Sequence, residues 1–265
     1  QHNLAGGNGI PTFGLTPEKW RDYTIDILYL CYSKRKFDPT VGRLLSIAGR
    51  LSHVCEIFPW ARAYLAPLTW LMSGCNTICK TSPGLWRTIK DATVPVPQIV
   101  LDLIWEIWEK VYKRTTSAID FVLIEEDCVL KLSTDWAPTG IGCVNMTNGE
   151  YVGIPIPKCH VMYTEHRKQS TFGELMGAYL AIEFWTRGTS GMRISLRGDN
   201  IGALVALQRW RSIRVSGPLV LMSARLIESR RIIIIPRYVN TTAIVADPLT
   251  HVGDKSEKNK TWWRD

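Results

Sequence analysis

The stretch LKLSTDWAPTGIGCV (Leu130–Val144) carries the pattern that decides the fold. Its first half alternates apolar and polar residues, which predicts a β-strand with one buried face. A proline and two glycines then turn the chain, and a second apolar run follows, as in a β-hairpin. Asp135 lies near the end of the first strand, where a sheet can present a carboxylate to solvent. Considered alone, an aspartate before a glycine turn is more often a cap than a catalytic group.

Composition restricts the classes of protein to consider. The 265 residues are 46% hydrophobic, enough for one large core or two modest ones. A net charge of +8 and a pI near 9.2 favour a polyanionic partner, nucleic acid before membrane, although a basic soluble protein fits the same charge. The best candidate for a membrane span, Val54–Ser73, contains Glu56, Arg62 and two prolines, so we expect no membrane span.

Seven cysteines are spread along the chain, and only Cys75 and Cys79 are close together. Neither a CxxC pair nor a histidine cluster accompanies them, so a zinc site is not expected. The thiols indicate a reducing intracellular compartment, nucleus or cytoplasm. The first residues are polar and glycine-rich and lack an initiator Met, which leads us to expect a processed or truncated piece of a longer protein.

The first part of the chain has helical periodicity. Thr16-Pro17-Glu18 has the residues of a helix start, and Asp38-Pro39-Thr40 opens a second helix with an apolar face. A third apolar helix starts at Pro59, and the stretch 97–114 has an apolar stripe that Trp105 and Trp108 widen. We interpret this tryptophan stripe as core or as an interdomain surface, before a base-stacking platform.

The periodicity changes after residue 116, where we place the domain boundary. The expected regions are a mainly helical region (1–116), a mixed α/β domain (117–255) and a charged tail (256–265). The mixed domain is predicted to contain an antiparallel meander, a helix capped by Thr171 and two later strands that alternate with helices. Its expected strands are Val129–Asp135, Ile141–Met146, Tyr151–Pro155, Met192–Leu196 and Arg231–Pro236. The continuous apolar run of the last strand predicts burial on both faces.

Four acidic residues occupy similar positions in these elements. Asp135 and Asp199 lie at strand ends, whereas Glu174 and Asp247 are expected in the first turns of helices. Strand ends and helix N-termini converge at one edge of an α/β sheet, so the carboxylates can share one site. Their repulsion favours a hard cation such as Mg²⁺, and two such ions can activate a water and stabilise the leaving oxygen of a phosphodiester. Each acid taken singly is also compatible with a cap or with a helix dipole.

Four motifs follow one another in the order TDWAPTGIGC, FGELMGAYLAI, LRGDNIGALVAL and VNTTAIVADPLTH. Together they resemble the ribonuclease H domain of retroelement reverse transcriptases over about Cys128 to His251, closest to the long-terminal-repeat and tyrosine-recombinase (DIRS-like) retrotransposons. The resemblance implies a ribonuclease H-like five-stranded mixed sheet with flanking helices, two-metal hydrolysis and an RNA–DNA hybrid as substrate. An integrase- or resolvase-like nuclease of the same fold is a weaker match, because the final Ala-Asp-Pro-Leu motif argues against it.

The first part resembles the same elements, in the thumb/connection-like region that joins polymerase to ribonuclease H. The matching motifs are Leu15-Thr16-Pro17-Glu18-Lys19, Gly49-Arg50-Leu51 and Arg62-Ala63-Tyr64-Leu65. The first part contains no Tyr-x-Asp-Asp polymerase motif. The resemblance therefore implies a partner, either the polymerase (fingers/palm) part of a reverse transcriptase or other chains of a larger assembly.

The resemblance also assigns the catalytic residues and metal ligands, which are Asp135, Glu174, Asp199 and Asp247. They would hold two Mg²⁺ ions, with Mn²⁺ as a substitute. His251 follows the last acid, whereas the family histidine that assists product release precedes it. Trp136 stands where the family has a small residue, and we expect it to crowd the metal site.

Contacts to nucleic acid are expected from the basic second half. The candidates are Asn200, Arg197, Arg209, Arg211 and Arg214. Arg209-Trp210-Arg211 combines charge with an aromatic ring, as a grip on a nucleic-acid backbone does. Asn200 is a candidate for contact with a 2′-hydroxyl, the group that distinguishes RNA from DNA. Each of the arginines is also compatible with a solvated helix end.

Two hypotheses remain from the sequence. The first is a Mg²⁺-dependent endonuclease (a hydrolase) that cuts the RNA strand of an RNA–DNA hybrid as the ribonuclease H part of a reverse transcriptase. The alternative is a domesticated, non-catalytic scaffold or RNA-binding subunit of a larger ribonucleoprotein assembly. The intact acids favour the first hypothesis, and the missing polymerase motif and Trp136 favour the second.

Overall fold

The computed structural model describes residues 2–3, 12–14, 16–33, 38–113, 116–118, 128–157, 166–212 and 216–251. The chain forms two compact units, Gln1–Phe121 and Val122–Asp265. The domain limits at residues 116 and 117 and the separate tail stay predictions, and the tail lies outside the described residues.

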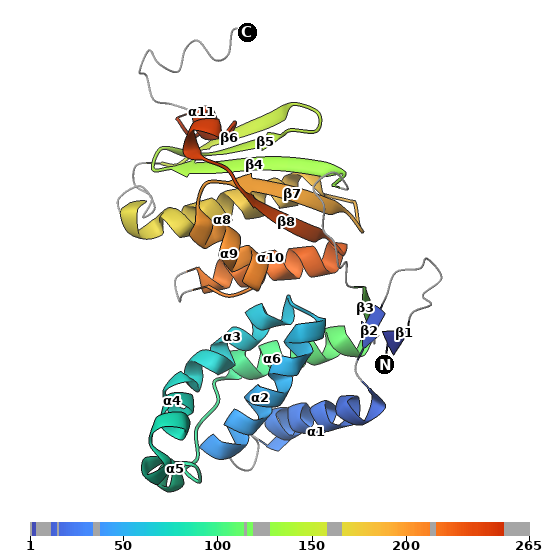
Figure 1. Cartoon of the computed structure of the whole chain (residues 1–265), viewed down its shortest axis with the longest axis vertical. Coiled ribbons are helices and arrows are strands. Elements are labelled where there is room, and N and C mark those ends of the chain that lie inside the picture. Colours follow the sequence, from blue (N-terminus) through green and yellow to red (C-terminus); the bar gives the residue numbers. More distant parts are fainter. Residues whose placement is uncertain are drawn as a thin grey trace. The chain divides into compact units, whose positions relative to one another are not determined.

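The first unit is mainly helical, as the periodicity predicts (Figure 1). α2 follows Thr40, whose hydroxyl accepts the backbone N–H of Arg43 at 3.2 Å and so caps the helix. The connector after α3 forms α4 in addition to the short helix expected around Trp86. The elements are β1 (His2–Asn3), β2 (Thr12–Gly14), α1 (Pro17–Ser33), α2 (Val41–Ile57), α3 (Ala61–Leu71), α4 (Ser73–Thr81), α5 (Pro83–Ile89), α6 (Gln98–Lys113) and β3 (Thr116–Ala118).

A buried carboxylate joins α1 to α2 in this unit. Asp26 is 1% exposed, and its Oδ1 accepts hydrogen bonds from Arg43 Nη2 at 3.1 Å and from Arg50 Nη2 at 2.7 Å. Desolvation raises the pKa of Asp26, and the two guanidinium groups act in the opposite direction. The two arginines therefore keep a charge inside an otherwise apolar helix contact.

The second unit contains a five-stranded mixed sheet with the order β6-β5-β4-β7-β8. β4 pairs antiparallel with β5, and β5 with β6, which is the predicted meander, whereas the β4–β7 and β7–β8 pairs are parallel. Helices flank this sheet, so the expected α/β, ribonuclease H-like fold is confirmed (Figure 1). The elements are β4 (Leu130–Ala137), β5 (Gly140–Asn145), β6 (Glu150–Pro155), α8 (His166–Trp185), β7 (Arg193–Gly198), α9 (Ile201–Arg209), α10 (Gly217–Arg230), β8 (Ile233–Tyr238) and α11 (Asp247–Thr250).

Neighbouring residues of the central strands point to opposite faces of the sheet. Cys143 faces α8, and its thiol donates to the Gly177 carbonyl oxygen at 3.6 Å. Val144 faces the opposite way and packs with residues of α11. Asp135 pairs with Gly142, two residues from Val144, so it belongs to the α11 face.

One helix begins earlier than the sequence predicts. α8 starts at His166, five residues before Thr171, and Glu174 therefore lies beyond the second turn and not in the first. The apolar periodicity identifies only the buried part of this helix, because polar residues of ordinary helix propensity can extend it at little cost. A position in the first turn, and with it a helix-dipole role for Glu174, is excluded.

The burial expected of the last strand is wrong. β8 forms at Ile233–Tyr238, but it lies at the edge of the sheet with β7 as its strand neighbour. Of its residues only Ile235 is buried. An apolar run of this length does not distinguish a central strand from an edge strand of a mixed sheet.

None of the described helices is long and apolar enough to cross a membrane. The six cysteines within the described ranges are free thiols, and Cys159 lies outside those ranges.

Candidate metal centre

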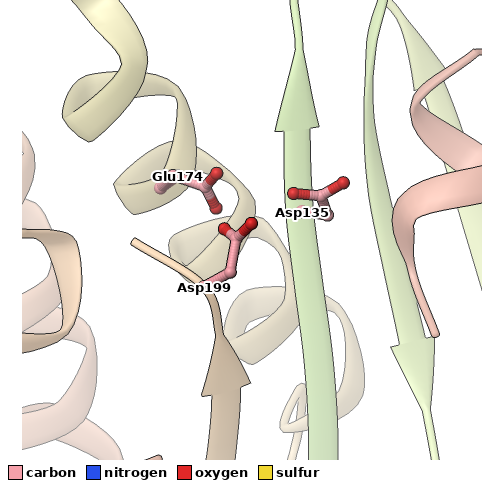
Figure 2. A group of neighbouring side chains, drawn as sticks. All are labelled: Asp135, Glu174 and Asp199. Carbon is pink, nitrogen blue, oxygen red and sulfur yellow. The ribbon is translucent and has the colours of Figure 1, made fainter. Parts of the chain in front are cut away.

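Three carboxylates from distant parts of the sequence meet in the second unit. Figure 2 shows Asp135 on β4, Glu174 on α8 and Asp199 after β7 directed toward one another. One ligand oxygen of each residue lies within 4.8 Å of the ligand oxygens of the other two. Such a group of oxygens can bind a shared cation.

The site forms where β4 and β7 separate. Their parallel pairing ends at Ser133 and Arg197, so Asp135 lies two residues beyond the last pair. Asp199 directly follows the last residue of β7. Glu174 of α8 meets both aspartates just beyond this last pair.

Asp247, the fourth predicted ligand, is the first residue of α11 and shares a hydrogen bond with Asp135. α11 approaches the sheet closely because Gly142 has no side chain: an added β-carbon would overlap the carbonyl oxygen of Ala246. Asp247 borders the group of three acids. Among the described residues, only Asp135, Glu174 and Asp199 have ligand oxygens that all lie within 4.8 Å of one another. His251 Nε2 lies 4.0 Å from Asp247 Oδ1, four residues after it in the sequence.

Burial and mutual repulsion hold protons on two of the acids. Desolvation, followed by the nearby charge of Asp199, raises the pKa of Asp135 to about 7. Desolvation, followed by the charges of Asp135 and Asp199, raises the pKa of Glu174 to about 9. A hydrogen bond from the backbone of Trp136 favours the charged form of both groups and is outweighed. The metal-free protein therefore carries less than the full negative charge of this cluster at neutral pH.

The donor set fits a hard divalent cation. Its atoms are carboxylate oxygens, which Mg²⁺ and Mn²⁺ accept as ligands. Within the described part of the chain, no lysine or arginine forms an ion pair with Asp135, Glu174 or Asp199. Their repulsion is thus not offset by a described basic side chain, and a bound cation would offset it.

These pKa shifts predict a pH dependence of stability in the absence of metal. The ordinary pKa values are 3.8 for Asp135 and 4.5 for Glu174, well below those of the folded state. The folded protein therefore binds more protons than the unfolded chain between about pH 4 and pH 9, and its stability falls as the pH rises through this range.

Asp135→Asn is expected to remove much of this penalty. In EDTA near pH 8, it should raise the melting temperature by a few degrees, for a gain of about 1 kcal/mol or more. Near pH 5 the difference should be much smaller, since the wild-type acids are then protonated. Differential scanning calorimetry at both pH values measures the effect, and a variant that melts below the wild type near pH 8 would contradict the repulsion described above.

The Trp136 ring lies on the opposite face of β4 from Asp135. It points to the α8 face and packs on Gly173, where an added β-carbon would overlap the indole ring. Strand alternation thus turns the ring away from Asp135, although Gly173 directly precedes Glu174 in α8. The expectation that Trp136 crowds the metal site stays a prediction.

The predicted nucleic-acid contacts lie at different distances from the acids. Asn200 adjoins Asp199 and caps α9, because its Oδ1 accepts the backbone N–H of Ala203 at 2.9 Å. Arg209 ends this helix, about 14 Å from Asn200 at 1.5 Å per residue, and is exposed. Arg197 lies in β7, at the last residue that pairs with β4.

The aromatic part of the Arg209-Trp210-Arg211 motif is not a surface for base stacking. Trp210 is 9% exposed and forms the left-handed C-cap of α9 with φ of 53°. Arg209 and Arg211 remain exposed on either side of it. Arg214 lies outside the described residues. Alternation of charge and aromatic residues here reflects core packing of the ring, with the arginines left at the surface.

The sequence motifs do not identify one further residue of the site. Thr241, in the 3₁₀ turn η2 (Thr241–Ala243), donates from its hydroxyl to Asp199 Oδ2 at 2.7 Å. It belongs to the VNTTAIVADPLTH motif, in which only the acid carries an obvious chemical signal. A threonine in a polar turn is common, and its contact with an acid far away in the sequence requires the fold.

No family model matches the chain, and no curated protein does either. Among solved structures it is similar to the foamy viral protease–reverse transcriptase in complex with double-stranded DNA, in two structures, each 16% identical. The first, of the dRH form, aligns with a TM-score of 0.29 over 86% of this chain and 35% of that chain. The second aligns with a TM-score of 0.28 over 86% of this chain and 42% of that chain, so this chain spans less than half the length of either protein.

Proposed function

We propose that this protein is a metal-dependent endonuclease of the ribonuclease H type, which hydrolyses the RNA strand of an RNA–DNA hybrid as part of a retroelement reverse transcriptase. The observation that carries the proposal is the meeting of Asp135, Glu174 and Asp199 within 4.8 Å, at the point where two parallel strands separate. Asp247 extends the same acidic surface through its hydrogen bond with Asp135.

The four acids would hold two Mg²⁺ ions, with Mn²⁺ as a substitute. Bound there, the ions would supply activation of a water and stabilisation of the departing 3′ oxygen. The charges of both Asp199 and Asp247 act on Asp135, and the Glu174 carboxylate lies within 4.8 Å of it, so Asp135 is within reach of the other acids expected to hold the ions. The acids also lose their bound protons when a cation replaces them, so binding should release protons near neutral pH.

Selection of RNA would depend on residues beside the acids. The Asn200 carboxamide oxygen is occupied by its cap bond, which leaves the amide N–H groups to donate to a 2′-hydroxyl. Arg197, Arg209 and Arg211 would contact phosphates of the hybrid at increasing distances from the scissile bond. Arg214 is included with them as a sequence-based candidate.

The first unit offers a surface for the polymerase part of a reverse transcriptase or for another chain. Four apolar or aromatic residues of α1 share one face at helical spacing and are exposed: Ile25, Leu28, Tyr29 and Tyr32. Exposed apolar stripes of this kind commonly mark contacts with partners. The same observation favours the second candidate function, a non-catalytic scaffold or RNA-binding subunit of a larger assembly.

Cleavage by the purified chain tests the first proposal. We expect Mg²⁺-dependent cutting of a labelled RNA strand in an RNA–DNA hybrid, with 3′-hydroxyl and 5′-phosphate ends because the 3′ oxygen is the leaving group. The same RNA in an RNA duplex, and DNA in a DNA duplex, should remain intact, and EDTA should stop the reaction.

Failure to cut the hybrid in either Mg²⁺ or Mn²⁺ would contradict the nuclease proposal. If the uncut hybrid is nevertheless bound, or if the protein co-purifies with other chains through the exposed face of α1, the scaffold function gains support. Ile25→Lys would then release those chains while leaving the melting temperature nearly unchanged, since the Ile25 side chain is more than half exposed.

A further inference from the structure

A hydroxyl from a neighbouring turn holds one of the metal-centre acids. Thr241 Oγ1 lies 2.7 Å from Asp199 Oδ2 and donates to it. We propose that Thr241 is a positioning residue, which fixes the orientation of the Asp199 carboxylate for cation binding. The inference rests on the proposed function, because it assigns Thr241 a role at the same site.

The turn that carries Thr241 is fastened to the end of β7. The Val239 backbone N–H donates to the Gly198 carbonyl oxygen at 3.0 Å, one residue before Asp199. Asn240 then shapes the turn, since its Oδ1 accepts the backbone N–H of Thr242 at 3.2 Å. Thr241 is therefore placed by backbone contacts and not by its own bond to the acid.

The other end of the same segment is fastened to the core beneath α11. Ile244, Ala246 and Leu249 are at most 6% exposed and pack with Val144 of β5. Asp247 lies between these buried residues in the sequence. The segment from Val239 to Asp247 thus carries both a donor to one acid and a second acid, and its two anchors set their spacing.

The Thr241 hydroxyl restricts the terminal side-chain torsion of Asp199. The terminal torsion of an aspartate is broad, so without a fixed partner the half-buried Asp199 carboxylate would sample several orientations. Hydrogen bonds from hydroxyl groups to charged oxygens are short and strong, and outer groups of this kind commonly alter metal affinity or activity by 10–100-fold. Because Thr241 is exposed to solvent, we expect an effect of about tenfold, the low end of this range.

Four variants of the full chain separate positioning from structural support. Thr241→Val keeps the shape of the side chain and removes the donor, Thr241→Ser keeps the donor, and Thr241→Ala removes both. Thr242→Val is the matched control, because the Thr242 hydroxyl contacts Asn240 Oδ1 at 3.3 Å and no acid of the site. The probe is Mg²⁺ alone, titrated while the melting temperature is measured relative to EDTA, with hybrid cleavage recorded separately.

We expect Thr241→Val and Thr241→Ala to need about tenfold more Mg²⁺ for half-maximal stabilisation, with melting temperatures in EDTA close to that of the wild type. Thr241→Ser and Thr242→Val should stay within about twofold of the wild type, in keeping with retention of the donor. A purely structural hydroxyl would lower the melting temperature in EDTA and leave the Mg²⁺ dependence unchanged, which would overturn the inference.

The two proposals fail in different ways. Mg²⁺ that stabilises the wild type without any cleavage of the hybrid overturns the nuclease function, and the variants then still report on positioning. Equal Mg²⁺ dependence of the wild type and Thr241→Val overturns positioning, whatever the cleavage result. A wild type that gains no stability from Mg²⁺ overturns both.

Discussion

Asp135→Asn and Asp199→Asn are each expected to lower the rate of hybrid cleavage by about a thousandfold or more. An amide oxygen keeps the size of the side chain and loses the negative charge that binds the cation. A bound metal ion supplies several kcal/mol of charge stabilisation, and each 1.36 kcal/mol corresponds to a tenfold change in rate. Single-turnover cleavage of a labelled hybrid in saturating Mg²⁺ measures the loss.

The matched control is Asp91→Asn, which alters a carboxylate of the first unit whose side chain is 80% exposed. It should cleave at the wild-type rate. Circular dichroism and melting in EDTA show whether the site variants are folded, and Asp135→Asn should melt above the wild type near pH 8, for the electrostatic reason given above. Undiminished Mg²⁺-dependent cleavage by both site variants would end the nuclease proposal.

Gly173→Ala is expected to lower the free energy of unfolding by about 2–3 kcal/mol, at the upper end of overpacking costs. The added β-carbon would overlap the indole of Trp136, a large ring that is only 9% exposed. Such a loss corresponds to a fall in melting temperature of roughly 4–12 °C for a chain of this size. Because Glu174 is the next residue, we also expect weaker stabilisation by Mg²⁺.

Gly49→Ala provides the matched control, since Gly49 is also inside a helix but has no neighbour within 4 Å of an added β-carbon. It should stabilise the protein by about 0.5–1 kcal/mol through helix propensity. Trp136→Leu removes the obstruction, so Gly173→Ala should cost much less in that background, which a double-mutant cycle by calorimetry measures. Equal costs in both backgrounds would show that the indole is not the cause.

Local patterns were sufficient to predict the meander and the start of α2, although not the start of α8. Alternation around Leu130–Val144 identifies the strand β4, but the prediction of a single buried face is wrong, because β4 is central in the sheet and both of its faces are buried. Asn148-Gly149 forms the turn between β5 and β6, with Gly149 at φ of +80°. Thr40 likewise caps α2, as its place before an apolar helix predicts. In each case the interacting groups are only a few residues apart, so the local sequence is enough to predict the turn or the helix start.

The site depends on contacts that are distant in the sequence. That Asp135 and Asp199 lie near one edge could be inferred from strand ends, but the approach of Glu174 depends on where β7 stops pairing with β4. The orientation of Trp136 and the donor role of Thr241 also require the register and the packed loops. The predicted burial of β8 failed for the same reason, since strand order is not a local property.

The three acids of the centre lie far apart in the sequence, so the ribosome adds them to the chain at different times. A nascent polypeptide that has emerged only through α8 has Asp135 and Glu174 but neither β7 nor Asp199. Without β7, Asp199 is missing from the group of three acids. Domains generally fold as units during translation, so the complete group of acids forms late in the biosynthesis of this protein, and its formation marks the completion of the second unit.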